Sequence, residues 1–240
     1  MVKPSADAGP RRRHASRVWL FDLDNTLHNA SASSFRRLDK AMNAYIGEQL
    51  RLSPAQADAL RHEYWRRYGA TLLGLIRHHG VRMQHFLHHT HRLPGLEAEL
   101  QAHPQDLAVL HRLPGRRYIL TNAPMDYTLR VLQALGMRHL FDGVISIEQM
   151  RMFGQLRPKP DARMFKALAA RLKVHPRDCV LVEDTLVHQK AAHAVGMRTA
   201  WMQRWARQGG HGPEKGARMS RRPAYVYARI RALQPLLSLP

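Results

Sequence analysis

The stretch Val18-Trp-Leu-Phe-Asp-Leu-Asp-Asn-Thr-Leu27 decides the fold of this chain. Four mostly apolar residues run directly into two aspartates at alternate positions, Asp22 and Asp24. A short apolar run that ends in polar residues predicts a buried strand that stops at the edge of a sheet. Ligands of open α/β sheets bind outside the carboxyl ends of the strands. The stretch therefore predicts an α/β fold and the place of its site.

The two aspartates predict a cation. Side chains two residues apart on an extended chain point the same way, so Asp22 and Asp24 would face one site. Two carboxylates that close repel each other unless a cation or a shared proton lies between them. Mg²⁺ is the hard, oxygen-seeking ion that suits such a place, and we expect it there.

Length and composition set the outer limits. The chain has 240 residues, enough for one medium domain or for a core with a smaller inserted domain. Its single cysteine, Cys179, excludes an intramolecular disulfide. The sequence has no apolar run of about 18 residues, so we expect no membrane span. We expect no secretory signal, because Asp22 and Asp24 interrupt the only candidate near the N-terminus, and we expect a cytoplasmic protein.

The formal net charge is +20, which raises the question of nucleic-acid binding. The basic residues are scattered along the chain and cluster only at 11–13 and 218–222. We therefore expect many solvated basic faces rather than a specific nucleic-acid site. A positive field would still favour an anionic substrate and speed its arrival. The oligomeric state has no signal in the sequence.

A long helical block follows the first strand. From residue 33 to about 103, apolar side chains recur at spacings of three and four, and Ser53-Pro-Ala-Gln56 is typical of a helix start. Because this block shows no strand pattern, we expect an all-helical cap domain at 31–104. The core domain would then consist of 17–30 and 105–240, with a flexible tail at 1–16.

Strands and helices alternate after this block, which predicts a doubly wound parallel sheet. A basic, glycine-rich loop is expected at 206–222. The further strands are expected at 118–122, 143–147, 179–182 and 198–202, with an edge strand at 224–227 and a closing helix at 230–237.

Polar residues lie at or near successive strand ends, and parallel strands would bring them to one edge of the sheet. Alone, each has an ordinary explanation: a helix cap, a solvated lysine or a strand-end turn. Together, two acidic pairs, a hydroxyl, an amide and a lysine suit a phosphate with Mg²⁺. The residues are Asp22, Asp24, Thr121, Asn122, Lys159, Glu183 and Asp184.

The order of these groups resembles the motifs of the haloacid-dehalogenase-like (HAD) phosphohydrolases. Phe21-Asp-Leu-Asp-Asn-Thr-Leu27 resembles the first motif, D-x-D-x-T-L. Thr121-Asn122, Lys159-Pro160 and Val182-Glu-Asp-Thr185 follow in the family's order. The resemblance covers roughly residues 17 to 204 and implies a Rossmann-like HAD core.

The resemblance also implies a covalent mechanism. Asp22 would attack phosphorus and form an aspartyl phosphate, which splits one hard step into two easier ones. Asp24 would protonate the leaving oxygen and then activate water. An acid at this position accompanies phosphoryl transfer in the superfamily and is missing from haloacid dehalogenases. A dehalogenase is therefore disfavoured, whereas a phosphomutase stays open.

The resemblance implies the binding roles of the remaining residues. Mg²⁺ would lie between the Asp22 carboxylate, the Asp24 backbone carbonyl and the Asp184 carboxylate. Glu183 would act through a water or orient Asp184. The phosphoryl oxygens would be held by Lys159, by Thr121 and by backbone amides near Leu23 and Asn122.

The helical insert resembles the cap of the subfamily that includes phosphoglycolate phosphatases and pyrimidine 5′-nucleotidases. Tyr68-Gly-Ala-Thr-Leu-Leu-Gly-Leu75, His78-His-Gly80 and Thr121-Asn-Ala123 are most similar to the nucleotidase branch. This implies hydrolysis of a nucleoside monophosphate to nucleoside and phosphate, with Arg77 and His78 as candidate substrate contacts.

Several alternatives stay open. The substrate could be phosphoglycolate or another small phosphomonoester, and the cap contacts could be ordinary helix-surface residues. A non-catalytic protein that binds phosphate or nucleic acid would be free to lose Asp22 or Asp24, and both are present. His85 and His89 lie four apart on one helical face, but without cysteines or acids at ligand spacing they do not predict zinc.

Overall fold

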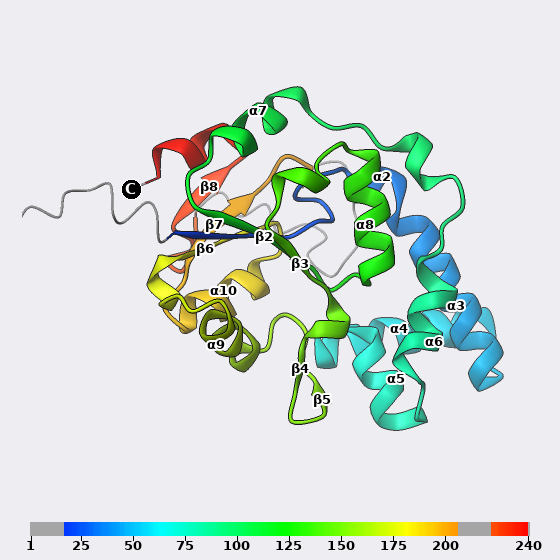
Figure 1. Cartoon of the computed structure of the whole chain (residues 1–240). Helices are drawn as coiled ribbons and strands as arrows, with labels where there is room; N and C mark the ends of the chain where they lie inside the picture. The colour runs from blue at the N-terminus through cyan, green and yellow to red at the C-terminus, as the bar shows by residue number, and fades with distance from the viewer. Residues whose placement is uncertain (1–16, 206–221, 240) are drawn as a thin grey trace, which may run out of the picture.

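The computed structural model describes residues 17–205 and 222–239 (Figure 1). The tail expected at 1–16 lies outside the described residues, as does all but the last residue of the loop expected at 206–222. The basic cluster at 11–13 and most of the one at 218–222 are outside them as well.

Six parallel strands form one sheet in the order β3-β2-β1-β6-β7-β8. The order runs outward from β1 in both directions, as in a doubly wound sheet. The predicted fold class is therefore confirmed. The strands are β1 (Val18–Phe21), β2 (Arg116–Leu120), β3 (Gly143–Ile145), β6 (Cys179–Glu183), β7 (Arg198–Met202) and β8 (Ala228–Ile230).

The register of the central strands aligns their carboxyl ends. Phe21 of β1 lies opposite Ile119 of β2 on one side and Val182 of β6 on the other. Asp22 and Glu183, which follow directly, therefore meet at the same edge of the sheet. The backbone N–H of Asp22 donates to the Val182 carbonyl at 2.9 Å and extends this alignment by one residue.

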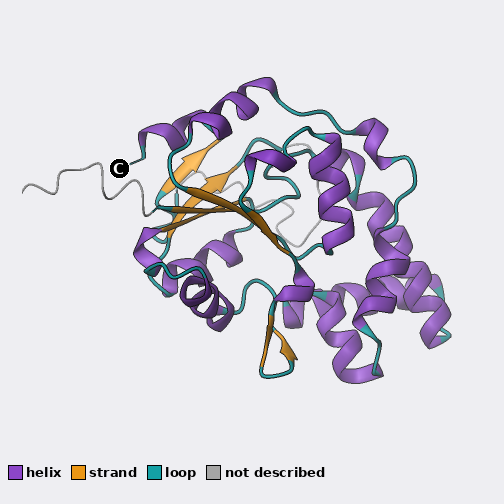
Figure 2. Cartoon of the chain, in the orientation of Figure 1, coloured by secondary structure: helices purple, strands orange, loops and turns teal. Residues whose placement is uncertain are grey.

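Helices cover both faces of the sheet (Figure 2). Trp19 and Phe21 pack in one core cluster with apolar residues of α7 (Pro104–Arg112) and α8 (Met125–Ala134). Val18 and Leu20 pack in another with residues of α9 (Ala162–Arg171) and α10 (Leu186–Ala194). Alternate side chains of β1 thus enter opposite cores. Because β1 is buried on both faces, its residues form a continuous apolar run, and this run is what predicted the strand.

The described chain between β1 and β2 is helical, with no strand in it. The expected helix start is confirmed: Ser53 Oγ accepts from the Gln56 N–H, and the Gln56 side chain accepts from the Ser53 N–H. Apolar residues of these helices form a separate core cluster, which Ile147 also joins. The cap boundaries at 31 and 104 stay a prediction. Five helices precede α7 in this part of the chain, and we call them together the helical segment. They are α2 (Ala30–Ser33), α3 (Phe35–Leu50), α4 (Pro54–Tyr68), α5 (Thr71–His79) and α6 (Met83–His91).

The C-terminal end differs from the expectation. The edge strand was expected at 224–227, but the strand found there is β8, at Ala228–Ile230. It starts later because its pairing with β7 begins only where the Tyr227 N–H donates to the Thr199 carbonyl. The expected closing helix at 230–237 is reduced to a short 3₁₀ helix at Gln234–Ser238.

Smaller elements complete the described chain. An antiparallel hairpin of β4 (Arg151–Met152) and β5 (Gln155–Leu156), which was not predicted, precedes Lys159. No described helix combines the length and apolar character needed to cross a bilayer. Further 3₁₀ helices are Leu96–Glu99, Arg138–Leu140, Ile147–Gln149 and Pro176–Asp178.

Candidate active site

Lys159 joins two of the predicted acidic residues at the carboxyl edge of the sheet. Its ammonium Nζ donates to Asp22 Oδ1 at 2.7 Å and to Glu183 Oε2 at 2.7 Å. All three side chains are buried. The three groups come from β6, the end of β1 and the segment before α9, so the topology alone brings them together.

Burial sets the electrostatics of this cluster. Loss of water raises the pKa of Asp22 to about 8, and the neighbouring Glu183 carboxylate adds to the rise. Burial also raises the pKa of Asp184 well above its ordinary value, again with Glu183 adding to the rise. For Lys159, burial alone would lower the pKa, but the Asp22 and Glu183 carboxylates raise it above its ordinary value. The ammonium therefore stays charged between them.

Asp22, Glu183 and Asp184 form the acidic cluster. They each offer an oxygen within 4.8 Å of the others. When all three acids are ionised, three carboxylates and one ammonium leave an excess of about two negative charges in a buried place, and a divalent cation supplies two positive charges. The donor set consists of hard carboxylate oxygens, which fits Mg²⁺.

Neighbouring groups fix the orientation of the β6 carboxylates. The Thr185 N–H donates to Glu183 Oε1 at 3.1 Å, and the Thr185 hydroxyl donates to Asp184 Oδ1 at 3.1 Å. The Trp201 indole N–H donates to the Asp184 carbonyl at 2.8 Å. His188 Nδ1 lies 3.0 Å from Glu183 Oε2, without the geometry of a hydrogen bond. Glu183 is thus surrounded by partners.

Asp24 lies outside the acidic cluster and has its own partners. Its Oδ1 accepts from the Tyr127 hydroxyl at 2.8 Å and from His28 Nε2 at 2.9 Å. The turn that follows is closed by Asn25, which has a left-handed φ of 56°. The Asn25 amide donates to Ser31 Oγ and accepts from the Ser31 N–H, and asparagine tolerates this backbone conformation.

The Asn122 side chain makes contacts that the sequence did not predict. Its side-chain amide donates to the Lys159 carbonyl at 2.9 Å and accepts from the Lys159 N–H at 3.0 Å. The amide therefore holds the segment that carries the lysine. Thr121 is buried next to it, and its Oγ1 accepts from the Ala123 N–H at 3.0 Å.

The two candidate contacts in the helical segment lie exposed on α5. His78 Nε2 is 2.5 Å from the Tyr68 hydroxyl, and the Arg77 guanidinium lies 5.9 Å from the Tyr68 ring centre. The described contacts of Arg77 and His78 are thus with their own helical segment. The loop before α5 does reach the core, because a Cβ on Gly69 would lie 2.7 Å from Pro160 Cδ.

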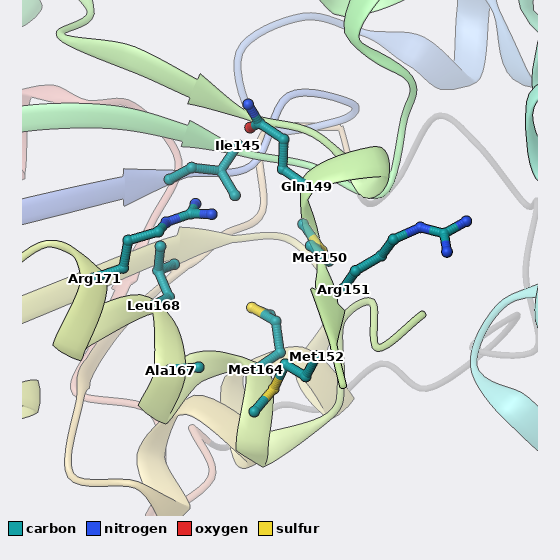
Figure 3. A pocket seen from close by; sticks show the side chains of 9 residues that line it. All are labelled: Ile145, Gln149, Met150, Arg151, Met152, Met164, Ala167, Leu168 and Arg171. Atoms are coloured by element: carbon teal, nitrogen blue, oxygen red, sulfur yellow. The ribbon is translucent and has the colours of Figure 1, made fainter. Parts of the chain in front are cut away.

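Two hollows lie beside these elements. One, of about 190 Å³, separates α6 from the start of α8 and is lined by side chains such as Gln84, His88, His91 and Tyr127. We call it the α6–α8 cleft. A smaller hollow of about 110 Å³ lies between β4 and α9 and includes Met150, Met152 and Met164 in its lining (Figure 3). None of the predicted site residues lines the smaller one.

Sequence reasoning missed Tyr127 and His28. His28 stands four residues after Asp24, a spacing that could have suggested a pair. Tyr127 is 103 positions from Asp24 and occupies an apolar face of a helix, where a tyrosine is an ordinary core residue. The sequence did not predict zinc at His85 and His89, although they lie four apart on one helical face. Their rings lie 4.3 Å apart, and in the described chain the acidic cluster is the group placed to hold a metal.

Residues 17–196 match the family of haloacid dehalogenase-like hydrolases. The chain belongs to this family. The match spans β1 to the end of α10 and includes every predicted site residue. The HAD hydrolase assignment made from the four motifs is therefore confirmed.

Two curated relatives are similar to this HAD hydrolase. It is 24% identical over 194 residues to Phosphate metabolism protein 8 of Saccharomyces cerevisiae, covering 76% of this chain and 60% of that protein. It is 37% identical over 67 residues to Fructose-1-phosphate phosphatase YqaB of Escherichia coli, covering 28% of this chain and 33% of that protein. The chain thus spans less than two thirds of either relative.

Solved structures share the fold. An L-2-haloacid dehalogenase superimposes with a TM-score of 0.62 at 19% identity, over 93% of this chain and 98% of that one. A HAD phosphatase from Thermococcus onnurineus gives 0.57 at 22%, over 92% and 95%. The HAD hydrolase YfnB from Bacillus subtilis, solved with magnesium, gives 0.55 at 18%, over 94% and 100%. Dehalogenases and phosphatases both fit, so the fold alone does not choose the reaction.

Proposed function

We propose that this HAD hydrolase is a Mg²⁺-dependent phosphomonoester hydrolase that works through an aspartyl phosphate on Asp22. The observation that carries the proposal is the acidic cluster with the Lys159 ammonium 2.7 Å from Asp22 Oδ1. A cation and an ammonium together would neutralise the charge that develops on a phosphoryl group. The ammonium also lowers the pKa of Asp22 against the effect of burial. It therefore favours the ionised carboxylate, which is the form that acts as a nucleophile.

Asp24 is the proposed general acid and base. Its Oδ1 already has two donors, and a second carboxylate oxygen remains for the leaving oxygen and later for water. A general acid or base contributes about 10²–10⁴-fold to such reactions. The presence of this acid favours phosphoryl transfer over dehalogenation.

The metal would be held by the Asp22 and Asp184 carboxylates and the Asp24 backbone carbonyl. It supplies Lewis-acid polarisation of the phosphoryl oxygens when bound. Glu183 already engages Lys159 and Thr185, which supports an orienting role for it. The similar hydrolase YfnB was solved with magnesium, which supports the choice of ion.

Thr121 and Lys159 are the proposed phosphate-binding side chains. The Thr121 Oγ1 accepts from a backbone N–H, so its own hydroxyl proton can be directed at a ligand. The Asn122 side chain is better explained as the residue that positions Lys159, and only its backbone N–H is proposed to reach phosphate.

We propose a nucleoside monophosphate, most simply a pyrimidine nucleotide, as the substrate. The lining of the α6–α8 cleft includes the exposed imidazole of His88, which offers an aromatic face to a base. The net charge of +20 would favour a phosphate. Arg77 and His78 stay candidate contacts that only binding data can test. A sugar phosphate is the alternative, supported by the similarity to Fructose-1-phosphate phosphatase YqaB.

A substrate panel tests the proposal. UMP, CMP, AMP, fructose 1-phosphate and phosphoglycolate are each assayed for phosphate release in Mg²⁺ and in EDTA. We expect release that needs Mg²⁺ and disappears in Asp22→Asn. The matched control is Asp178→Asn, which lies just before β6 at the opposite edge of the sheet and should keep full activity.

The panel also separates the alternatives. Activity on phosphoglycolate or fructose 1-phosphate, with none on UMP or CMP, would overturn the nucleotidase assignment and keep the phosphatase. A protein inert toward the whole panel that retards DNA at physiological salt would instead be a non-catalytic binder.

A further inference from the structure

Tyr127 lies where a helix of the core meets the carboxylate of Asp24. Its side chain is 1% exposed, and its hydroxyl donates to Asp24 Oδ1 at 2.8 Å. A buried tyrosine hydroxyl needs a partner, and this one has an acid from another element, 103 positions away in the chain. Packing around the ring in the core fixes the direction of the hydroxyl.

His28, four residues after Asp24, contacts the same carboxylate oxygen. Its Nε2 lies 2.9 Å from Asp24 Oδ1, and the imidazole is 2% exposed. Its Nδ1 is buried and has no hydrogen-bond partner. The contact of Nε2 with Asp24 is therefore the side-chain hydrogen bond that the structure gives to this buried imidazole.

The two donors give the two oxygens of the Asp24 carboxylate different roles. Because Oδ1 accepts from both Tyr127 and His28, Oδ2 is the oxygen left to carry a proton toward a ligand. The side chain also cannot rotate without losing both hydrogen bonds. A general acid that is held in one rotamer needs no reorganisation when the reaction occurs.

Tyr127 also joins Asp24 to the helical segment. Its hydroxyl lies 3.1 Å from the Oγ of Ser34, the residue between α2 and α3. The His91 ring at the end of α6 packs edge-on against the Tyr127 ring, with centroids 5.8 Å apart. The orientation of the acid is therefore connected to both ends of the helical segment that lies between β1 and β2.

We propose that Tyr127 and His28 are positioning residues that hold Asp24 for proton transfer to the leaving oxygen. The inference rests on the proposed phosphatase function. In the step concerned, the bond from Asp22 to phosphorus forms while the bond to the leaving oxygen breaks. The proton on Asp24 Oδ2 passes to that oxygen, and water later returns a proton to Asp24.

The leaving group provides the test. p-Nitrophenolate leaves without protonation, whereas the 5′-oxygen of UMP needs the proton from Asp24. We expect Tyr127→Phe to lower kcat/KM for UMP about tenfold or more and kcat/KM for p-nitrophenyl phosphate less than about threefold. The matched control is Tyr64→Phe, which removes a hydroxyl that contacts His79 in the helical segment and should change neither value.

His28 supplies a second, independent set of variants. His28→Gln keeps a nitrogen donor near the position of Nε2 and should retain the ratio of the two kcat/KM values, whereas His28→Leu should lower it as Tyr127→Phe does. These variants decide the question if Tyr127→Phe fails to fold.

Each outcome has one meaning. Equal losses on both substrates in Tyr127→Phe and His28→Leu would overturn the positioning role and leave a structural one. If the wild-type protein does not hydrolyse UMP, fructose 1-phosphate replaces UMP as the substrate whose leaving oxygen needs a proton. A wild-type protein inert toward every ester would instead defeat the proposed function.

Discussion

At the scale of single residues, Lys159 is the side chain whose charge balances the buried carboxylates of the site. It is buried, and it is the ammonium that faces both Asp22 and Glu183. Removing one partner of a buried ion pair leaves the other charges without compensation. The sequence pointed to this lysine only through its place before Pro160 and a helix, and its two contacts come from the fold.

We expect Lys159→Met to abolish phosphatase activity and to lower the free energy of unfolding by about 3–5 kcal/mol. Denaturant unfolding in EDTA measures the loss. Lys166→Met, on the exposed face of α9, is the control and should change stability little. A Lys159→Met protein as stable as this control would mean that the buried cluster is not charged as described.

Asp22 predicts how metal binding depends on pH. Its folded-state pKa of about 8 lies above the ordinary value of 3.8, so folding favours the protonated form. The free energy of unfolding of the metal-free protein should therefore fall as pH rises between these values, as far as Asp22 determines it. Glu183, Asp24 and Asp184 repel the Asp22 carboxylate, and Lys159 attracts it.

Mg²⁺ competes with that proton, so the increase in Tm caused by Mg²⁺ over EDTA should be larger at about pH 8 than at about pH 5. Taking the difference cancels groups that do not contact the metal, such as His91, whose pKa burial lowers to about 4. Asp184→Asn should shrink the increase at both pH values. An increase that is the same at both pH values in the wild-type protein would contradict the raised pKa of Asp22.

At the scale of elements, the ends of β1 and β6 could be predicted because both strands are buried runs that stop in acids. β8 could not be placed, because its start depends on pairing with β7 and not on its own residues. The role of Asn122 was missed for the same reason: its partner, the Lys159 backbone, lies 37 positions away.

The loop between α4 and α5 gives the element-scale prediction. Gly69 and Gly80 both end helices with positive φ, 77° and 63°. A Cβ would meet Pro160 Cδ at 2.7 Å at Gly69 and nothing within 4 Å at Gly80. Both alanine variants should lose about 1–2 kcal/mol through backbone strain.

We expect only Gly69→Ala to lower kcat/KM, because the displaced loop presses on the residue after Lys159. Thermal melts and steady-state kinetics on both variants measure the two effects separately. Equal kcat/KM values in the two variants would show that this loop does not influence the site.

At the scale of the whole molecule, the parallel sheet is what brings the residues of the acidic cluster together. The alternation of strands and helices predicted that Asp22, Lys159 and Asp184 would meet, although 162 positions separate the first from the last. What could not be predicted was packing between elements, such as the approach of Tyr127 to Asp24, because it depends on how α8 lies across the sheet. The proposed role of the α6–α8 cleft in substrate preference depends on such packing as well, since side chains of both α6 and α8 line it.

The most direct test of an aspartyl phosphate on Asp22 is a burst experiment with Asp24→Asn and p-nitrophenyl phosphate in Mg²⁺. Without its base, this variant should release about one p-nitrophenolate per site quickly and then stall, because the phosphorylated carboxylate is not hydrolysed. The double variant with Asp22→Asn should show no burst. A burst of equal size in the double variant would contradict Asp22 as the nucleophile.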